Sequence, residues 1–219
     1  DKFEGSPQVG IALKIAPHVF LRPSELAQLP WSEVDFENQQ IKIPKERMKM
    51  ASEHIVPLSP QVTFLLKQMQ RISGNHKYVF PSIVNNPNKS ISPESLRSGL
   101  RRLGIDKDTL TTHGLRHMAS TQLHEQGFKS DIIERQLSHG ERNKIKATYN
   151  HAEYLGERRD MMNQWSNFLD ALKADYELAS LAILSINSLA SFMVSLLSTL
   201  PLNFNRLIIS ACLSCWTSP

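Results

Sequence analysis

The sequence is poor in cysteine, with only Cys212 and Cys215 among its 219 residues. Two cysteines cannot build a disulfide scaffold, and one Cys-x-x-Cys pair without a second gives little support for a zinc site. We therefore interpret both as incidental thiols. Clusters of Asp and Glu that would indicate bound magnesium are also lacking, which disfavours an ordinary metal-dependent endonuclease. The sequence predicts no cofactor and no metal.

The chain also lacks a basic and then apolar leader, and it starts at Asp1. We expect a fragment or processed piece of an intracellular protein. Hydrophobic residues make up 41% and charged residues 21%, a balance that excludes disorder of the whole chain and a fibrous class. The formal net charge of +4 and a pI of about 9.1 are compatible with a polyanionic partner without requiring one.

Charged residues almost disappear near residue 177. From Leu178 to Pro219 the only charged side chain is Arg206, so 24 of the 25 basic residues and all 21 acidic residues precede this stretch. We expect one folded domain over residues 1–173. Residues 174–219 are predicted to be an apolar tail, rich in serine and leucine, whose structure the sequence does not define.

The tail has the length of a membrane span but not its composition. Its uncharged stretch, residues 178–205, exceeds the roughly 20 residues that cross a bilayer. Many serines, Asn187 and Pro201 dilute it, and a clear basic cluster is missing from its flanks. Three interpretations stay open: a membrane or interface segment, a helix that docks on a partner, and a C-terminus outside any folded unit.

Hydrophobic spacing in the first 173 residues predicts a mainly α domain with one small antiparallel β-hairpin. Ser92 and Ser130 are expected to cap helices, and Gly104 and Gly127 to end them. The predicted helices cover residues 7–20, 23–29, 60–71, 93–103, 114–125, 130–137 and 154–172. The predicted strands cover residues 40–44 and 54–58, with a hairpin-like connection over 45–53 and a loop over 81–93.

A candidate anion site begins at the predicted start of the helix over 114–125. His113 and Arg116 lie three residues apart there, so both side chains and free backbone N–H groups can face one anion. Alone, this spacing is more typical of surface or capping residues than of an anion site. Further candidates occur in order along the chain: Arg22 with Glu25, Lys49 in the hairpin, His139, and Tyr149 ten residues later.

Taken together, these residues resemble the catalytic domain of the tyrosine recombinases, the phage integrase family. Neighbouring segments are similar to the P4-like prophage integrases. These segments are residues 22–26, 31–33, 46–50, 54–58 and 149–154. The resemblance covers about residues 5–172 and implies the tyrosine recombinase catalytic-domain fold, without the helical core-binding domain that normally precedes it.

The resemblance implies a metal-free attack on a DNA phosphodiester. Tyr149 would form a 3′-phosphotyrosine link, which another 5′-hydroxyl can reverse. Arg22 and Arg116 would clamp the non-bridging phosphate oxygens, because guanidinium groups match phosphate geometry. His139 would add a hydrogen bond to the same phosphate.

Two further residues would move protons, and one would orient an arginine. His113 would assist proton transfer at the attacking oxygen, and Lys49 would protonate the departing 5′ oxygen. Glu25 would orient the guanidinium of Arg22. The arginines would supply the electrostatic stabilisation that a metal supplies elsewhere.

Alternatives remain for several of these residues. Tyr154 competes with Tyr149 as the nucleophile, Lys45 competes with Lys49, and His117 is expected to have a structural role. Three arginines on one predicted helix are either DNA-phosphate contacts or a solvated basic face: Arg97, Arg101 and Arg102. Three histidines are interpreted as surface or packing residues: His54, His124 and His151.

The resemblance implies a site-specific recombinase or integrase that acts on a double-stranded DNA attachment site. Its implied partners are three further copies in a homo-tetramer and an accessory protein that bends DNA. Its implied location is the bacterial cytoplasm, with the nucleoid. Two other hypotheses are a truncated prophage remnant that only binds DNA and a membrane-associated interaction protein built on the tail.

Overall fold

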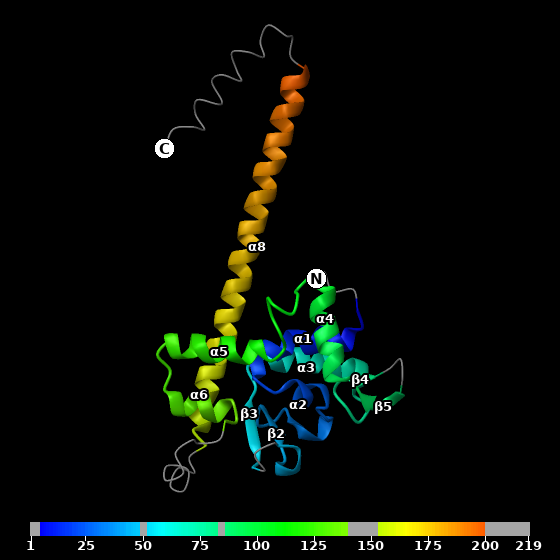
Figure 1. Cartoon of the computed structure of the whole chain (residues 1–219), viewed down its shortest axis with the longest axis vertical. Coiled ribbons are helices and arrows are strands. Elements are labelled where there is room, and N and C mark those ends of the chain that lie inside the picture. The colour runs from blue at the N-terminus through cyan, green and yellow to red at the C-terminus, as the bar shows by residue number, and fades with distance from the viewer. Residues whose placement is uncertain (1–4, 49–51, 83–85, 140–152, 200–219) are drawn as a thin grey trace. The chain divides into compact units, whose positions relative to one another are not determined.

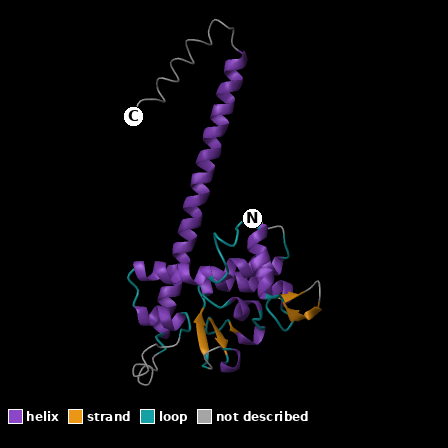
Figure 2. Ribbon diagram, in the orientation of Figure 1, coloured by secondary structure: helices purple, strands orange, loops and turns teal. Residues whose placement is uncertain are grey.

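The structure is a computed structural model, and it describes residues 5–48, 52–82, 86–139 and 153–199. The chain forms two compact units, residues 1–168 and 169–219. Helices dominate the first unit, with a few short strands (Figures 1 and 2). The described helices are α1 (Pro7–Val19), α2 (Pro23–Ala27), α3 (Pro60–Ser73), α4 (Pro93–Arg102), α5 (Gly114–Glu125), α6 (Ser130–Gln136) and α8 (Leu155–Thr199).

Helix α1 is the centre of the first unit, because it packs against α2, α3, α4 and α5. Val9, Ala12 and Ile15 recur at helical spacing on its buried face. Pro17 lacks the N–H that continues a helix. Shortly after it, α1 ends at Val19, and the cap residue Phe20 has a left-handed φ of 56°.

A three-stranded antiparallel sheet follows α2. Its strands are β1 (Val34–Asp35), β2 (Gln40–Ile43) and β3 (His54–Pro57), in that order. Ile41 lies opposite Val56 in the register of β2 and β3, and both side chains are fully buried. The predicted β-hairpin and the mainly α class are confirmed. Short 3₁₀ turns precede β1 at Trp31–Glu33 and follow β2 at Lys45–Arg47.

The prediction of a loop over residues 81–93 was wrong in its first part. Strands β4 (Pro81–Ser82) and β5 (Asn86–Ser90) form an antiparallel pair. Most side chains of β5 are exposed, so the pairing depends on backbone hydrogen bonds and leaves no alternating apolar pattern to recognise.

Helix ends follow local side-chain chemistry. The Ser92 hydroxyl accepts a hydrogen bond from the Ser95 N–H at 3.2 Å, which confirms the predicted cap. Ser130 is instead the first residue of α6, because Lys129 occupies the cap position. Gly104 and Gly127 follow α4 and α5 with φ of 80° and 83°, a conformation that glycine adopts without a Cβ clash.

Helix α8 closes the core of the first unit against α1. Trp165 is fully buried, and its indole N–H donates to the Pro17 carbonyl at 2.8 Å. Its ring meets Phe20 edge-on with centroids 5.7 Å apart. His18 Nδ1 lies 2.9 Å from the Ser166 hydroxyl in the same interface. The last helix of the domain is thus held by the first.

The prediction that this helix ends near residue 172 was wrong, because α8 extends to Thr199. In the second unit, large apolar side chains of α8 are exposed, including Leu172, Tyr176 and Leu178. No described helix combines the length and the apolar character that crossing a membrane requires. Cys212 and Cys215 lie outside the described residues, and the boundary near residue 173 stays a prediction.

Candidate active site

Arg22 is fixed at the start of α2 by the carboxylate of Glu25. Glu25 Oε1 accepts from Arg22 Nη1 at 2.7 Å, and Oε2 accepts from the Arg22 backbone N–H at 2.8 Å. Glu25 is almost completely buried, whereas the Arg22 side chain is 22% exposed. A buried carboxylate therefore orients a guanidinium that stays partly accessible. Arg22 Nη2 also donates to the Ser138 carbonyl at 3.3 Å.

Arg116 reaches the same place from the first turn of α5. Its side chain is buried, Nη1 donates to the Phe20 carbonyl, and Nη2 donates to the Leu137 carbonyl at 2.6 Å. Leu137 and Ser138 are consecutive residues at the end of α6. The two arginines that the sequence singled out therefore converge on one helix end.

Two left-handed residues create the carbonyl positions that the arginines use. Phe20 ends α1 with φ of 56°, and Ser138 follows α6 with φ of 51°. This conformation costs a residue other than glycine about 1 kcal/mol or more. The hydrogen bonds from Arg116 and Arg22 stabilise these turns, so the arginines and the turns fix each other.

The site is electropositive. Burial, with the charge of Arg22 adding to it, lowers the pKa of Arg116 to about 10, while Glu25 and Glu134 oppose the shift. Arg116 therefore stays charged at neutral pH. Its Nε atom is buried and has no hydrogen-bond partner among the described residues. A buried donor of this kind favours binding of an anionic acceptor.

His113 lies directly before α5 and is exposed. The small part of the ring that is shielded from water lowers the pKa of His113 by desolvation, and the nearby His117, Arg116, Arg22 and His139 lower it further. The imidazole is therefore neutral at pH 7 and can accept a proton. The His117 ring lies edge-on to it, with centroids 4.9 Å apart.

The backbone at the start of α5 differs from the prediction of free N–H groups. The Gly114 N–H donates to the Thr111 hydroxyl at 2.9 Å, and the Leu115 N–H to the Thr111 carbonyl at 3.3 Å. The Arg116 N–H donates to the His113 carbonyl at 3.1 Å. These three backbone N–H groups are satisfied within the turn, so only side chains can bind an anion here.

His139 is held by a carboxylate that the sequence analysis missed. Its Nδ1 lies 2.6 Å from Glu134 Oε2, and its backbone N–H donates to the Glu134 carbonyl at 3.0 Å. Both side chains are about half exposed. Since Nδ1 is engaged with a carboxylate, Nε2 is the nitrogen left to face a ligand, and it can donate only when both ring nitrogens carry a proton. The spacing of five residues across a helix end gave no recognisable motif.

A second missed ion pair supports the hairpin. Arg47 Nη1 pairs with the Glu33 carboxylate, and Nη2 donates to the Glu25 carbonyl at 3.1 Å. The turn that precedes Lys49 is thereby tied to the residue that orients Arg22. Lys49 and Tyr149 themselves lie outside the described residues, and the competing Lys45 is exposed.

Comparison with known proteins now identifies the family. The model of the phage integrase family matches residues 8–155, and these include every candidate from Arg22 to Tyr149. The chain belongs to the phage integrase family. The resemblance seen in the sequence is thus confirmed.

Relatives of this integrase-family chain come from phages and prophages. It is 41% identical over 189 residues to the integrase of Enterobacteria phage P4, covering 80% of this chain and 43% of that protein. It is 40% identical over 150 residues to prophage integrase IntA of Escherichia coli K12, covering 68% and 36%. The chain therefore spans about two fifths of the length of these relatives.

A solved structure shares the fold. The integrase from mycobacterium phage Brujita matches 74% of this chain and 53% of its own with a TM-score of 0.57 and 18% sequence identity. At this identity the likeness concerns architecture. It confirms the predicted integrase catalytic-domain fold.

The arginines of α4 in this integrase domain differ from one another. Arg97 pairs with Glu94 at 3.0 Å on the surface. Arg101 donates to the Ile105 and Leu110 carbonyls and thereby holds the segment between α4 and α5. Arg102 is exposed. DNA contacts by Arg97, Arg101 and Arg102 stay a prediction.

Metal-ligating side chains are dispersed. Within residues 5–48, 52–82, 86–139 and 153–199, no three His, Cys, Asp or Glu side chains lie together in a way that could hold a metal ion.

His54, which begins β3, is buried beside the site. Burial lowers the pKa of His54 to about 3, and the charges of Arg158, Arg135, Arg116 and Arg22 act in the same direction. The sequence analysis expected a surface or packing role, and the structure makes it a neutral packing residue.

His54 should make the integrase domain acid-sensitive. In the unfolded chain a histidine binds a proton below pH 6.5, whereas folded His54 does not until about pH 3. Its contribution to stability is therefore complete above pH 7 and is lost as the pH falls below 6.5. Between pH 7 and 5.5 the loss is about 1 kcal/mol.

Urea unfolding at pH 7 and pH 5.5 measures this loss. His54→Gln should remove about 1 kcal/mol of the difference between the two pH values, whatever its effect at pH 7. His76→Gln, in the turn after α3, is the matched control for replacing a histidine by glutamine. An unchanged pH difference in His54→Gln would contradict the assignment.

Proposed function

We propose that this chain is the catalytic part of a site-specific DNA recombinase that cuts and rejoins double-stranded DNA through a 3′-phosphotyrosine intermediate. One observation carries the proposal: Arg22 and Arg116 converge on the end of α6, with His113 and His139 beside them. Two guanidiniums and two imidazoles at one point suit a phosphodiester. Membership of the phage integrase family supports the reaction class.

The arginines would bind the non-bridging oxygens of the scissile phosphate. Their charge would then stabilise the extra negative charge of the pentavalent transition state. A phosphate oxygen would also give Arg116 Nε the acceptor that the described residues do not supply. His139, oriented by Glu134, would face the same phosphate with Nε2 and donate to it as an imidazolium.

The proton balance follows from the remaining residues. The Tyr149 oxygen attacks phosphorus, the new P–O(Tyr) bond forms, and the bond to the 5′ oxygen breaks. His113 is suited to take the phenolic proton, because its lowered pKa leaves the ring unprotonated at pH 7. Lys49 would give a proton to the departing 5′ oxygen. A 5′-hydroxyl attacking the phosphotyrosine reverses every step and reseals DNA.

The proposed reaction bears on the assembly of the protein, and its location is a separate prediction. Exchange between two duplexes requires four active sites, which supports a homo-tetramer on DNA. A DNA-bending accessory protein and a location with the bacterial nucleoid also remain predictions. The observations at the active site bear on the chemistry of one protomer.

Covalent trapping tests the proposal on the unmodified chain. The protein is incubated at low salt, with a chelator present, with a pool of nicked duplexes that carry candidate sites. We expect a protein–DNA complex that resists SDS and releases phosphotyrosine on acid hydrolysis. A trapped complex that releases phosphoserine would contradict the proposed nucleophile. DNA retained on a filter without any SDS-resistant complex would favour a remnant that only binds DNA.

A further inference from the structure

Arg158, in the first turns of α8, is fully buried. A buried charge is unfavourable unless hydrogen bonds satisfy it, so such a residue depends on its partners. The proposed chemistry does not use this side chain. Its environment shows what it holds together.

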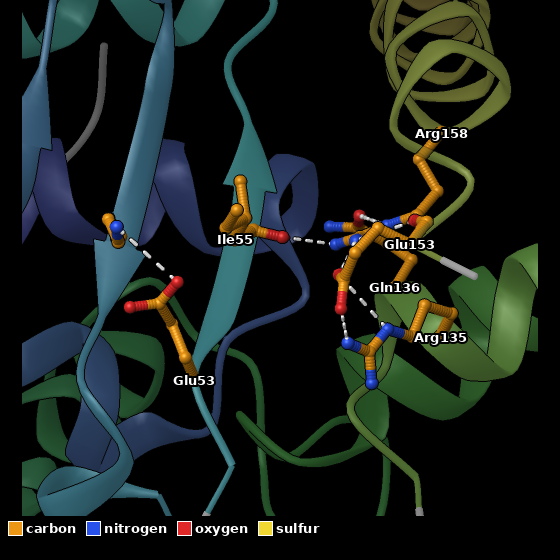
Figure 3. A network of polar contacts seen from close by, with 7 residues as sticks. Glu53, Ile55, Arg135, Gln136, Glu153 and Arg158 are labelled. Atoms are coloured by element: carbon orange, nitrogen blue, oxygen red, sulfur yellow. Dashed lines mark hydrogen bonds and ion pairs between the residues drawn. The ribbon is translucent and has the colours of Figure 1, made fainter. Parts of the chain in front are cut away.

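The guanidinium of Arg158 is bound by three separate segments (Figure 3). Nε donates to Gln136 Oε1 of α6 at 3.0 Å, and Nη1 donates to the Glu153 carbonyl at 3.3 Å. Nη2 donates to the Ile55 carbonyl of β3. Gln136 also reaches α1 through the Val19 carbonyl at 3.5 Å.

An ion-pair network extends from Arg158 to the surface. Glu153 Oε2 lies 3.6 Å from Arg158 Nη1, and Arg135 Nε donates to the same oxygen at 3.2 Å. Figure 3 shows the Glu153 carboxylate between the two guanidiniums. Glu153 and Arg135 are 42% and 32% exposed, and ion pairs this exposed contribute little to stability. The network therefore determines the position of Glu153 and adds little to the stability of the folded domain.

The three segments that meet at Arg158 each lead to a residue of the proposed active site. The separations along the sequence are short. Glu153 follows Tyr149 by four residues, Ile55 follows Lys49 by six, and Gln136 precedes His139 by three.

We propose that Arg158, Glu153 and Arg135 form a positioning clamp, which sets the placement of the nucleophile, general-acid and phosphate-binding segments relative to one another. The inference rests on the proposed function, since it concerns the rate of that reaction. None of the three touches the reacting atoms in this proposal. Their effect passes through the backbone of the segments that they hold.

The geometry of arginine explains why the clamp needs this residue. A planar guanidinium presents donors in fixed directions and can hold three acceptors at set angles, whereas an ammonium group is a compact charge on a flexible stem. Misplacement of a catalytic group by about 1 Å can slow a reaction on the order of a hundredfold. A variant that weakens the clamp should therefore attach to DNA covalently at a measurably lower rate.

The test is the single-turnover rate of covalent attachment to saturating nicked DNA, measured for the full chain. Arg135→Gln and Glu153→Gln are expected to slow attachment about tenfold, with melting temperature and DNA retention as in the wild type. Arg158→Lys should be slower still. Arg159→Gln is the matched control, because Arg159 donates to the Asn38 and Gln39 carbonyls of the turn between β1 and β2.

A second substrate separates positioning from a purely structural role. Replacing the bridging 5′ oxygen by sulfur gives a leaving group that needs no proton donor. Arg158→Lys should regain part of its rate on this substrate, because Ile55 leads to the Lys49 hairpin. Arg135→Gln should regain none, because it acts on the segment of Tyr149.

Each outcome decides a different point. No covalent complex with the wild type would overturn the proposed function itself. A wild-type complex with Arg135→Gln and Glu153→Gln at the wild-type rate would overturn the clamp. Rates that fall only in step with melting temperature and DNA retention would also overturn it, in favour of a structural role. If Arg158→Lys does not fold, the two surface variants decide.

Discussion

Tyr149→Phe is expected to abolish the SDS-resistant protein–DNA complex, whereas Tyr154→Phe is expected to retain it. Phenylalanine keeps the ring but removes the only oxygen that can bond to phosphorus. No slower route to the same intermediate remains, so the expected loss is complete. Trapping on nicked duplexes, with both variants beside the wild type, measures it.

The backbone at Tyr154 supports this choice between the two tyrosines. Tyr154 has a left-handed φ of 46°, and its carbonyl accepts the Arg158 N–H at 2.8 Å at the start of α8. A residue fixed in a helix-starting turn is poorly suited to approach DNA and withdraw. Filter retention is the control, because both variants should hold DNA as the wild type does. A complex that persists in Tyr149→Phe and disappears in Tyr154→Phe would reverse the assignment.

Arg116→Lys is expected to slow covalent attachment by about a thousandfold, although the charge is kept. Removing one preorganised donor to a developing oxyanion costs on the order of a hundred- to a thousandfold. The three donors of a lysine ammonium share one nitrogen on a flexible stem, so they do not reproduce the separated Nη1, Nη2 and Nε directions with which Arg116 can reach the Phe20 carbonyl, the Leu137 carbonyl and a phosphate. Single-turnover trapping at saturating DNA gives the rate.

The same substitution should also destabilise the domain. Two carbonyl groups lose a charged donor, and each unsatisfied buried group costs about 1–3 kcal/mol. Urea unfolding measures this cost and defines conditions in which the variant is fully folded for the rate assay. Arg71→Lys, at an exposed position of α3, is the matched control for both measurements. A folded Arg116→Lys within about threefold of the wild-type rate would exclude Arg116 from the catalytic role.

Local spacing made part of the site predictable. Glu25 lies three residues after Arg22, so a helical turn brings their side chains together. Ser92 precedes a proline and a helical pattern, which is a recognisable start signal. In both cases the partners are neighbours in sequence, and the chemistry of a few residues determines the contact.

Contacts between distant residues were not predictable from the same patterns. Arg116 binds the carbonyl of Phe20, 96 residues away, and Arg158 binds that of Ile55, 103 residues away. A backbone carbonyl is present at every residue, so sequence gives no sign of which one an arginine will use. Short strands such as β5 are hidden for a similar reason, because their pairing involves the backbone rather than side chains.

The contact of Trp165 with α1 has a consequence for synthesis of the chain. Pro17 and Trp165 are 148 residues apart, so a ribosome makes α1 long before the helix that covers it. Until the chain has been translated past Trp165, the Phe20 ring lacks its aromatic partner. A product that stops short of residue 165 is therefore expected to leave this part of the core exposed and to be degraded.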